Sequence, residues 1–175
     1  MKRAWLALTA LLVATPLSAQ MGQGDGSVAG VRGLYQTVRG YITAAAEQMP
    51  EDKYAYRPTE EVRSFGQIIG HVANAGYLFC APVRGQQAPD TGDAEKLMSK
   101  AELVAALKAS FEYCDAAYQL SGTDAGAALQ FFGQPHTKLS VLAFNMGHAF
   151  EHYGNLVTYM RLNGMVPPSS QRSGN

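Results

Sequence analysis

Residues 139–163 read LSVLAFNMGHAFEHYGNLVTYMRLN, and this stretch decides the fold class because it is the most strongly helical segment of the chain. Its apolar side chains recur every three to four residues, a spacing that gathers them on one face of an α-helix. Gly164 follows, and glycine is the usual residue at a left-handed helix end. We therefore predict a helix that begins near Thr137 or Leu139 and ends at Asn163.

Three more segments with helical spacing lie upstream. The first covers about residues 27–49. The second begins at Ser64 and the third at Ser99, and Gln67 and Glu102 follow them by three residues. Each pair is typical of a capping box at a helix start. No stretch alternates apolar and polar residues as a half-buried strand does, and no internal repeat occurs.

Four helices in a chain of this length predict an all-α protein folded as a four-helix bundle. The connections 50–63, 81–98 and 122–136 are longer than the tight turns that join adjacent antiparallel helices. We therefore expect at least one long crossover connection.

The histidines provide the best indication of function. His148 and His152 lie four residues apart, so they share one face of the last helix. His71, on the second helix, can add a third imidazole and leave coordination positions open for water or substrate. We predict a divalent metal ion on these three side chains, with zinc favoured and nickel, iron or copper also suited to imidazole. In the alternative interpretation, the histidines are ordinary surface residues.

Polar neighbours of the histidines are candidates to support them. Asn74, Asn145, Glu151 and Asn155 carry hydrogen-bonding groups close to a predicted ligand in sequence. Metal-bound histidines usually hydrogen-bond such groups through the other ring nitrogen. The remaining histidine, His136, precedes the last helix, and we expect it at the surface or at the helix entrance.

The string His148-Ala149-Phe150-Glu151-His152 also matches the H-x-x-E-H pattern of a peptidase class. In that class a carboxylate further along the chain is the third metal ligand. No Asp or Glu follows His152, so the sequence argues against a peptidase of this kind.

Cys80 and Cys114 are the two cysteines of the chain. In an oxidising compartment they would form a disulfide that closes a loop of about 35 residues. The alternative is a pair of buried thiols that do not meet, because an even number of cysteines does not fix their geometry.

The N-terminus has the layout of a secretory signal peptide. Lys2 and Arg3 precede an apolar run over 5–13, which is too short to span a bilayer, and small residues end at Ala19. We predict that residues 1–19 are removed and that the protein is exported, either periplasmic or secreted. The alternative is a short anchoring helix that stays uncleaved.

The rest of the chain should form one domain. We expect a flexible, Gly-rich lead-in over 20–26, the bundle over 27–168 and a flexible tail over 169–175. Loss of the signal leaves a formal charge of about −2 and no membrane-spanning segment. The chain has no basic stripe, so a nucleic-acid partner is not expected.

Two segments resemble known motifs. Residues 63–74, RSFGQIIGHVAN, are similar to the first histidine motif of the DinB/YfiT-like family. Residues 147–156, GHAFEHYGNL, with Tyr159, Arg161 and Gly164 beyond them, are similar to its C-terminal H-x-x-x-H motif. The resemblance extends over nearly the whole chain after the signal.

This resemblance implies a DinB-type bundle in which His71, His148 and His152 bind a divalent metal. Some relatives are thiol-dependent S-transferases, and many are regarded as metal-dependent enzymes. The chain departs from the family pattern at Asn155, where glutamine is common, and in its export signal. Small thiol cosubstrates are largely cytosolic, so the signal argues against S-transferase activity.

We therefore expect a metal-dependent enzyme acting on an unknown small molecule, with hydrolase- or thiol-transferase-like chemistry. Glu151, or Glu47 at the end of the first helix, is a candidate general base. A non-catalytic metal- or ligand-binding bundle of the cell envelope is the alternative, and a structural or interaction domain is a third. Self-association as a homodimer is compatible with each.

Overall fold

The computed structural model describes residues 18–171, with side chains from Gly26 onward. Helices dominate, and the 3₁₀ segments are short. The elements in chain order are α1 (Ser18–Gln48), η1 (Glu51–Lys53), α2 (Phe65–Val83), η2 (Ala94–Lys96), α3 (Lys100–Ala117), α4 (Gly122–Ala125), β1 (Ala128–Phe131), β2 (Gln134–Thr137), α5 (Lys138–Leu162) and η3 (Pro168–Ser170).

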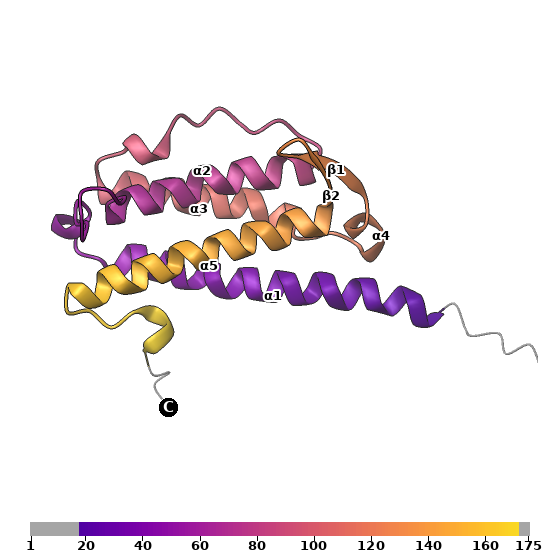
Figure 1. Ribbon diagram of the computed structural model, residues 1–175, viewed down its shortest axis with the longest axis horizontal. Helices are drawn as coiled ribbons and strands as arrows, with labels where there is room; N and C mark the ends of the chain where they lie inside the picture. The colour runs from indigo at the N-terminus through magenta and orange to yellow at the C-terminus, as the bar shows by residue number, and fades with distance from the viewer. Residues whose placement is uncertain (1–17, 172–175) are drawn as a thin grey trace, which may run out of the picture.

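The four long helices form a bundle around one core. α2 packs against α3 and α5, and α1 packs against α5 and α3 (Figure 1). α2 and α3 run in the same direction, and residues 84–99, here called the strap, return along the outside of the pair (Figure 1). The predicted four-helix bundle with a long crossover is confirmed.

The core consists of apolar side chains from all four long helices. These are the positions that the three-to-four spacing places on one face of each helix. Representative buried residues are Tyr35, Val38 and Ile42 from α1, Ile68, Ile69 and Val72 from α2, Leu103, Leu107 and Phe111 from α3, and Leu142, Leu156 and Met160 from α5.

Side-chain caps set the helix starts. The Ser64 hydroxyl accepts from the Gln67 backbone, and the Gln67 side chain accepts from the Ser64 backbone, so both halves of the predicted box are present at α2. Ser99 and Glu102 form the same pair at α3. A further box at Thr137 begins α5, at one of the two predicted starts.

A disulfide joins Cys80 on α2 to Cys114 on α3, as predicted, and both residues are fully buried. The amide nitrogen of Asn145, on α5, lies 3.7 Å from the Cys80 sulfur. The cross-link therefore holds the two parallel helices together beneath α5. Within residues 18–171, no helix is long and apolar enough to cross a membrane.

The expectation of no strands was wrong, because β1 and β2 form an antiparallel hairpin before α5. Each strand has only four residues, and neither ALQF nor QPHT shows the strict apolar–polar alternation that marks a half-buried strand. Phe132 and Gly133 form the two-residue turn, and both have positive φ angles, 49° and 73°. Such mirror-image turns match the twist of a hairpin.

The N-terminal segment also differs from the prediction. α1 begins at Ser18, so it covers residues 20–26, which we expected to be a flexible lead-in. Glycines weaken a helix by about 1 kcal/mol each but do not break it as proline does, and no proline lies between Ser18 and Gln48. Residues 1–17 of the predicted signal peptide lie outside the described residues.

The predicted flexible tail is partly ordered. η3 includes Ser169, whose backbone N–H donates to the Tyr153 hydroxyl at 2.8 Å. The Gln171 side chain donates to Gln48 at the end of α1, at 2.7 Å. Residues 169–171 therefore lie against the bundle, because α1 and α5 supply partners that composition does not reveal. Residues 172–175 lie outside the described residues.

Candidate metal centre

The three histidines predicted as ligands meet where α2 faces α5. Nε2 of His148 lies 3.2 Å from Nε2 of His71 and 3.0 Å from Nε2 of His152. One ligand atom from each residue lies within 4.8 Å of the other two. Three imidazole nitrogens therefore converge on one point.

This geometry suits a transition-metal ion. Zinc–nitrogen bonds of about 2.1 Å in a tetrahedral site place neighbouring nitrogens about 3.4 Å apart. The two close separations around His148 fall near that value. Three nitrogen donors leave at least one tetrahedral position open. The donor set therefore fits an ion with a vacant coordination site.

Burial keeps two of the imidazoles neutral. His152 is only 8% exposed, and burial lowers its pKa to about 4, with further lowering from the adjacent His148 and His71 rings. Burial also lowers the pKa of His148, and His71 acts in the same direction. Both side chains are therefore uncharged at neutral pH, which is the form that binds a metal ion.

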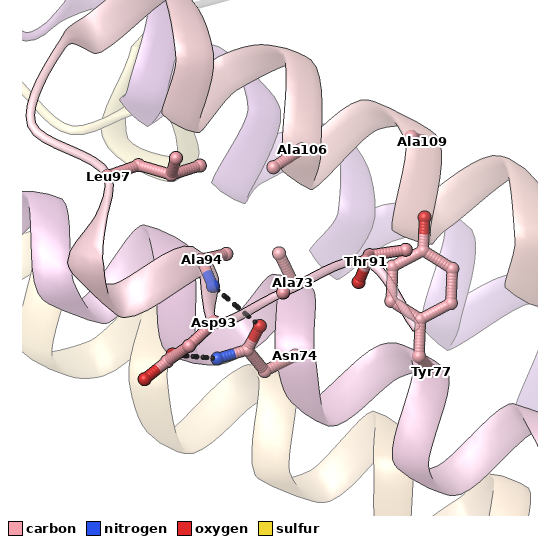
Figure 2. Close-up of a pocket in the computed structure, with 10 residues that line it drawn as sticks. Ala73, Asn74, Tyr77, Thr91, Asp93, Ala94, Leu97, Ala106 and Ala109 are labelled. Carbon is pink, nitrogen blue, oxygen red and sulfur yellow. Dashed lines mark hydrogen bonds between the residues drawn. The ribbon is translucent and has the colours of Figure 1, made fainter. Parts of the chain in front are cut away.

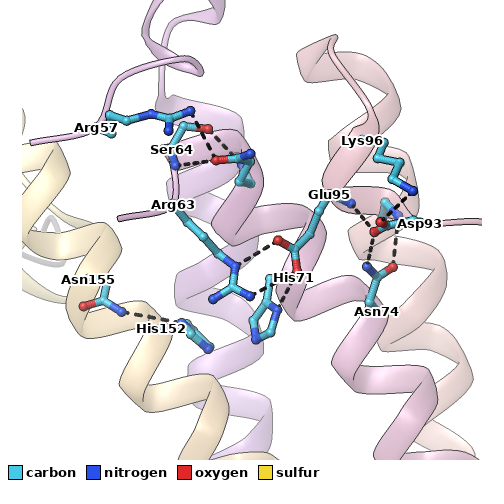
Figure 3. Close-up of polar contacts among 12 residues, drawn as sticks. Arg57, Arg63, Ser64, His71, Asn74, Asp93, Glu95, Lys96, His152 and Asn155 are labelled. Atoms are coloured by element: carbon cyan, nitrogen blue, oxygen red, sulfur yellow. Dashed lines mark hydrogen bonds and ion pairs between the residues drawn. The ribbon is translucent and has the colours of Figure 1, made fainter. Parts of the chain in front are cut away.

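Glu95 fixes the orientation of His71. Its Oε1 lies 2.7 Å from Nδ1 of His71 (Figure 3). An ionised carboxylate only accepts hydrogen bonds, so Nδ1 carries a proton, and in the neutral ring Nε2 then keeps its lone pair. That lone pair is on the ring nitrogen that faces His148. A carboxylate in this position is typical of metal-ligating histidines.

Arg63 in turn holds Glu95. Its Nε donates to Oε2 of Glu95 at 2.9 Å, and a second guanidinium nitrogen lies 3.4 Å from Oε1 (Figure 3). Burial raises the pKa of Glu95, but the hydrogen bonds and charges of Arg63 and His71 outweigh it and lower the pKa. Tyr159 on α5 donates to the Arg63 carbonyl at 2.9 Å. Glu95 is therefore ionised, and its carboxylate is held in place by Arg63 and His71.

The strap reaches His71 because α2 lets it approach closely. A Cβ on Gly70 would lie 2.7 Å from the Glu95 backbone nitrogen, so only glycine leaves room for the strap. Asn74, one turn further along α2, donates to Asp93 at 2.8 Å and accepts from the Ala94 N–H at 3.0 Å (Figure 2). Asn74 thus anchors the strap rather than a histidine ring.

The other predicted supporting residues differ in position. Asn155 Nδ2 lies 3.5 Å from Nδ1 of His152 (Figure 3). If the two ends of this amide are exchanged, its oxygen accepts the Nδ1 proton, as a metal on Nε2 requires. Asn145 is buried and donates to the Tyr118 hydroxyl at 3.0 Å. Glu151 is exposed, and among residues 18–171 no hydrogen bond links it to a histidine.

Two more side chains lie apart from the centre. His136 is on β2, with Nδ1 3.4 Å from the Ser140 hydroxyl in the first turn of α5. This agrees with its predicted position at the helix entrance. Glu47, considered above as a general base, instead forms an ion pair with Lys108 on α3 at 2.6 Å.

Sequence reasoning missed Glu95 and Arg63. Glu95 is 24 residues from His71 and lies in a connection without helical periodicity. Nothing local marks it as a partner, because its position depends on how the strap crosses α2. Arg63 lies next to the Ser64 cap, and its sequence context suggests only a helix start.

Two of the solved structures with a similar fold are DinB-like proteins. A DinB-like protein from Bacillus subtilis has 24% sequence identity and a TM-score of 0.66, and the match covers 82% of this chain and 99% of that protein. A DinB-like protein from Bacillus cereus ATCC 10987 has 16% identity and a TM-score of 0.67, with coverage of 78% and 94%. At these identities the likeness shows the fold alone. No protein of curated function matches this chain.

The family comparison covers the site as well as the fold. The DinB superfamily profile matches residues 34–156, which is more than half of the chain. The matched segment includes His71, His148 and His152, and it confirms the resemblance seen in the two histidine motifs. This chain belongs to the DinB superfamily.

Proposed function

We propose that the protein binds one divalent metal ion, zinc in the first instance, through His71, His148 and His152. The observation that carries the proposal is the hydrogen bond from His71 to Glu95. It selects the tautomer in which the neutral His71 ring presents its Nε2 lone pair toward His148, whose Nε2 lies 3.2 Å away. Burial adds to this by keeping His148 and His152 uncharged.

We further propose that the centre is catalytic and acts on a small molecule, with hydrolase- or thiol-transferase-like chemistry. A divalent ion in such a site acidifies a bound water or stabilises a substrate thiolate. The residues of the chain position the ligands: α5 holds two of them one turn apart, and Arg63 keeps Glu95 on His71.

A non-catalytic metal- or ligand-binding role is the second candidate, and a specific observation favours it. Glu95 is the one carboxylate among residues 26–171 that hydrogen-bonds a member of the histidine cluster, and it is already held by Arg63 and His71. A free general base is therefore not part of the described site. Within the described site, the chain would therefore supply no carboxylate that could take up a proton during hydrolysis.

Elemental analysis tests the metal proposal directly. Protein purified without an affinity tag should contain one divalent ion per chain after dialysis at neutral pH. Protein that takes up no zinc, nickel, copper or iron under these conditions would contradict both the enzyme and the metal-binding role.

A Glu95→Gln variant should bind the metal about 10- to 100-fold more weakly, the usual effect of losing a partner of a ligating histidine. The amide is uncharged and cannot stabilise the His71 N–H as a carboxylate does. Competition with a fluorescent zinc chelator measures the affinity. Glu151→Gln is the matched control, because it removes a carboxylate beside His152 that hydrogen-bonds no histidine. Equal losses of metal affinity in the two variants would mean that the negative charge, and not the hydrogen bond to His71, strengthens metal binding.

The metal-free protein should lose stability as the pH falls from about 6.5 to about 4. His152 has a pKa of about 4 when folded and an ordinary value of 6.5, so the unfolded chain binds more protons in this window. The loss should be on the order of 2 kcal/mol. Urea unfolding with a chelator present, at pH 7 and pH 4.5, measures it. A His152→Gln variant should show a clearly smaller change, and an unchanged pH dependence would contradict the assignment.

We also propose that the protein is exported, with cleavage after Ala19. The signal-like N-terminus supports this, as does the Cys80–Cys114 disulfide, since disulfides persist mainly in oxidising compartments. Mass spectrometry of the native protein should therefore give the mass of a chain whose first residue is Gln20. Recovery of a full-length cytosolic chain that still carries Trp5 would contradict export.

A further inference from the structure

An apolar groove opens directly beside the histidine cluster. Its volume is about 500 Å³, and His71 and His148 line one end of it. Leu78 on α2, Phe144 on α5 and Phe132 at the hairpin tip form its walls. Figure 1 shows that the hairpin lies at the end of the bundle where α2 ends and α5 begins.

Aromatic rings connect this groove to the centre. The Phe79 ring, which is buried, lies 5.2 Å from the His148 ring and 5.4 Å from Phe144, both edge to face. Phe131 packs 5.5 Å from Phe79 and 4.2 Å from Phe132. The groove is thus the outer surface of a packed aromatic cluster that includes a proposed ligand.

Phe132 is held in an unfavourable position at the tip. It is 66% exposed, and its φ of 49° is one that non-glycine residues rarely adopt. Asparagine or glycine is the usual first residue of such a turn. Strained backbone of this kind clusters at active sites and ligand-binding sites, so the outlier motivates a functional hypothesis. In this protein, the turn places the exposed ring of Phe132 at the wall of the groove.

No charged side chain lines the groove among the described residues; its polar groups are Asn74 and the two histidines. The ion pair of Arg63 and Glu95 approaches His71 at Nδ1, the ring nitrogen that does not face the other histidines. A ligand in the groove therefore meets apolar carbon along its length and nitrogen donors at one end.

We propose that this groove binds the aromatic or branched aliphatic part of an uncharged small-molecule substrate, whose polar head reaches the metal ion. The proposal rests on the metal-binding function proposed above and names its substrate class. The volume falls within the range of about 300–1,000 Å³ found for small-molecule sites.

A second copy of the chain is a weaker candidate for the occupant. A stable interface uses about 20–30 residues on each side. The groove exposes three large apolar side chains, those of Leu78, Phe132 and Phe144. A concave site of this size next to open coordination positions suits a small molecule better than a flat protein surface.

Two hydroxamates test the proposal on the zinc-loaded protein. Benzohydroxamate and acetohydroxamate chelate zinc through the same head and differ in the group that would enter the groove. Calorimetry should show that the phenyl compound binds at least about tenfold more tightly, since burial of apolar area drives such binding. Equal affinities with one zinc bound per chain would overturn the groove proposal and leave metal binding intact. Absence of bound zinc would instead overturn the proposed function.

Matched variants then locate the phenyl group. Leu78→Ala should reduce the preference for the phenyl compound, whereas Leu34→Ala should not, because Leu34 is equally exposed, 51% against 50%, but lies on α1. Phe132→Asn introduces a residue that suits the turn and removes the ring, so it should reduce the preference without loss of thermal stability. Equal effects of Leu78→Ala and Leu34→Ala would overturn the assignment to this groove. A sedimenting dimer that Leu78→Ala dissociates, with the phenyl preference unchanged, would assign the surface to a second copy.

Discussion

A His148→Ala variant is expected to lose metal binding almost completely. Nε2 of His148 lies close to both other ligand atoms, at 3.2 Å from His71 and 3.0 Å from His152. Its removal leaves two imidazoles on different helices, with no central donor. Loss of a residue that only hydrogen-bonds a ligating histidine already lowers metal affinity about 10- to 100-fold. Loss of the ligand itself should therefore weaken binding by more than a hundredfold. Elemental analysis and chelator competition measure the loss.

His136→Ala is the matched control for this experiment. It removes an imidazole from β2 that contacts Ser140 and takes no part in the cluster. The variant should bind one ion per chain with the affinity of the unmodified protein. Similar losses in the His136 and His148 variants would show that the three-histidine assignment is wrong.

Removal of the disulfide should have the largest effect on stability. The bond joins residues that are 34 positions apart, and closing a loop of this length stabilises a protein by about 3–4 kcal/mol in the chain-entropy treatment. The Cys80→Ala, Cys114→Ala double variant should therefore unfold at a clearly lower urea concentration. Urea titration, followed by circular dichroism, measures the difference from the oxidised protein.

The double variant also separates stability from metal binding. The disulfide lies in the core between α2 and α3, whereas the histidines lie between α2 and α5. Below its unfolding transition, the variant should still bind one ion per chain. The oxidised protein with reducing agent added is a second comparison. If the double variant and the reduced protein both unfold at the same urea concentration as the oxidised protein, the cross-link contributes little to stability.

The bundle could be predicted from sequence because its signals are local. Apolar residues spaced three to four apart mark the buried faces, and the side-chain hydrogen bonds of Ser64 and Ser99 define two helix starts. The convergence of His148 and His152 follows from helical geometry alone. That His71 joins them requires only that the second and last helices be neighbours, as they are in this bundle.

The missed features depend on contacts between distant segments. Glu95 reaches His71 only because Gly70 admits the strap and Asn74 anchors it. The hairpin strands do not alternate apolar and polar residues, and Phe132 is an unusual residue for its turn. Asn145 illustrates the converse difficulty: the sequence shows that a polar side chain needs a partner, but the partner proved to be Tyr118.

The dependence of the centre on the strap has a kinetic consequence. Within the strap, η2 is the only helical element, and side-chain hydrogen bonds of Asn74 and ion pairs of Glu95 hold it against α2. Loop segments in general open locally at a lower free-energy cost than helices. Each opening would withdraw Glu95 from His71 while the bundle stays folded. The residence time of a bound ion would then be set by a loop motion, and exchange of the ion could be fast in a protein that itself unfolds slowly.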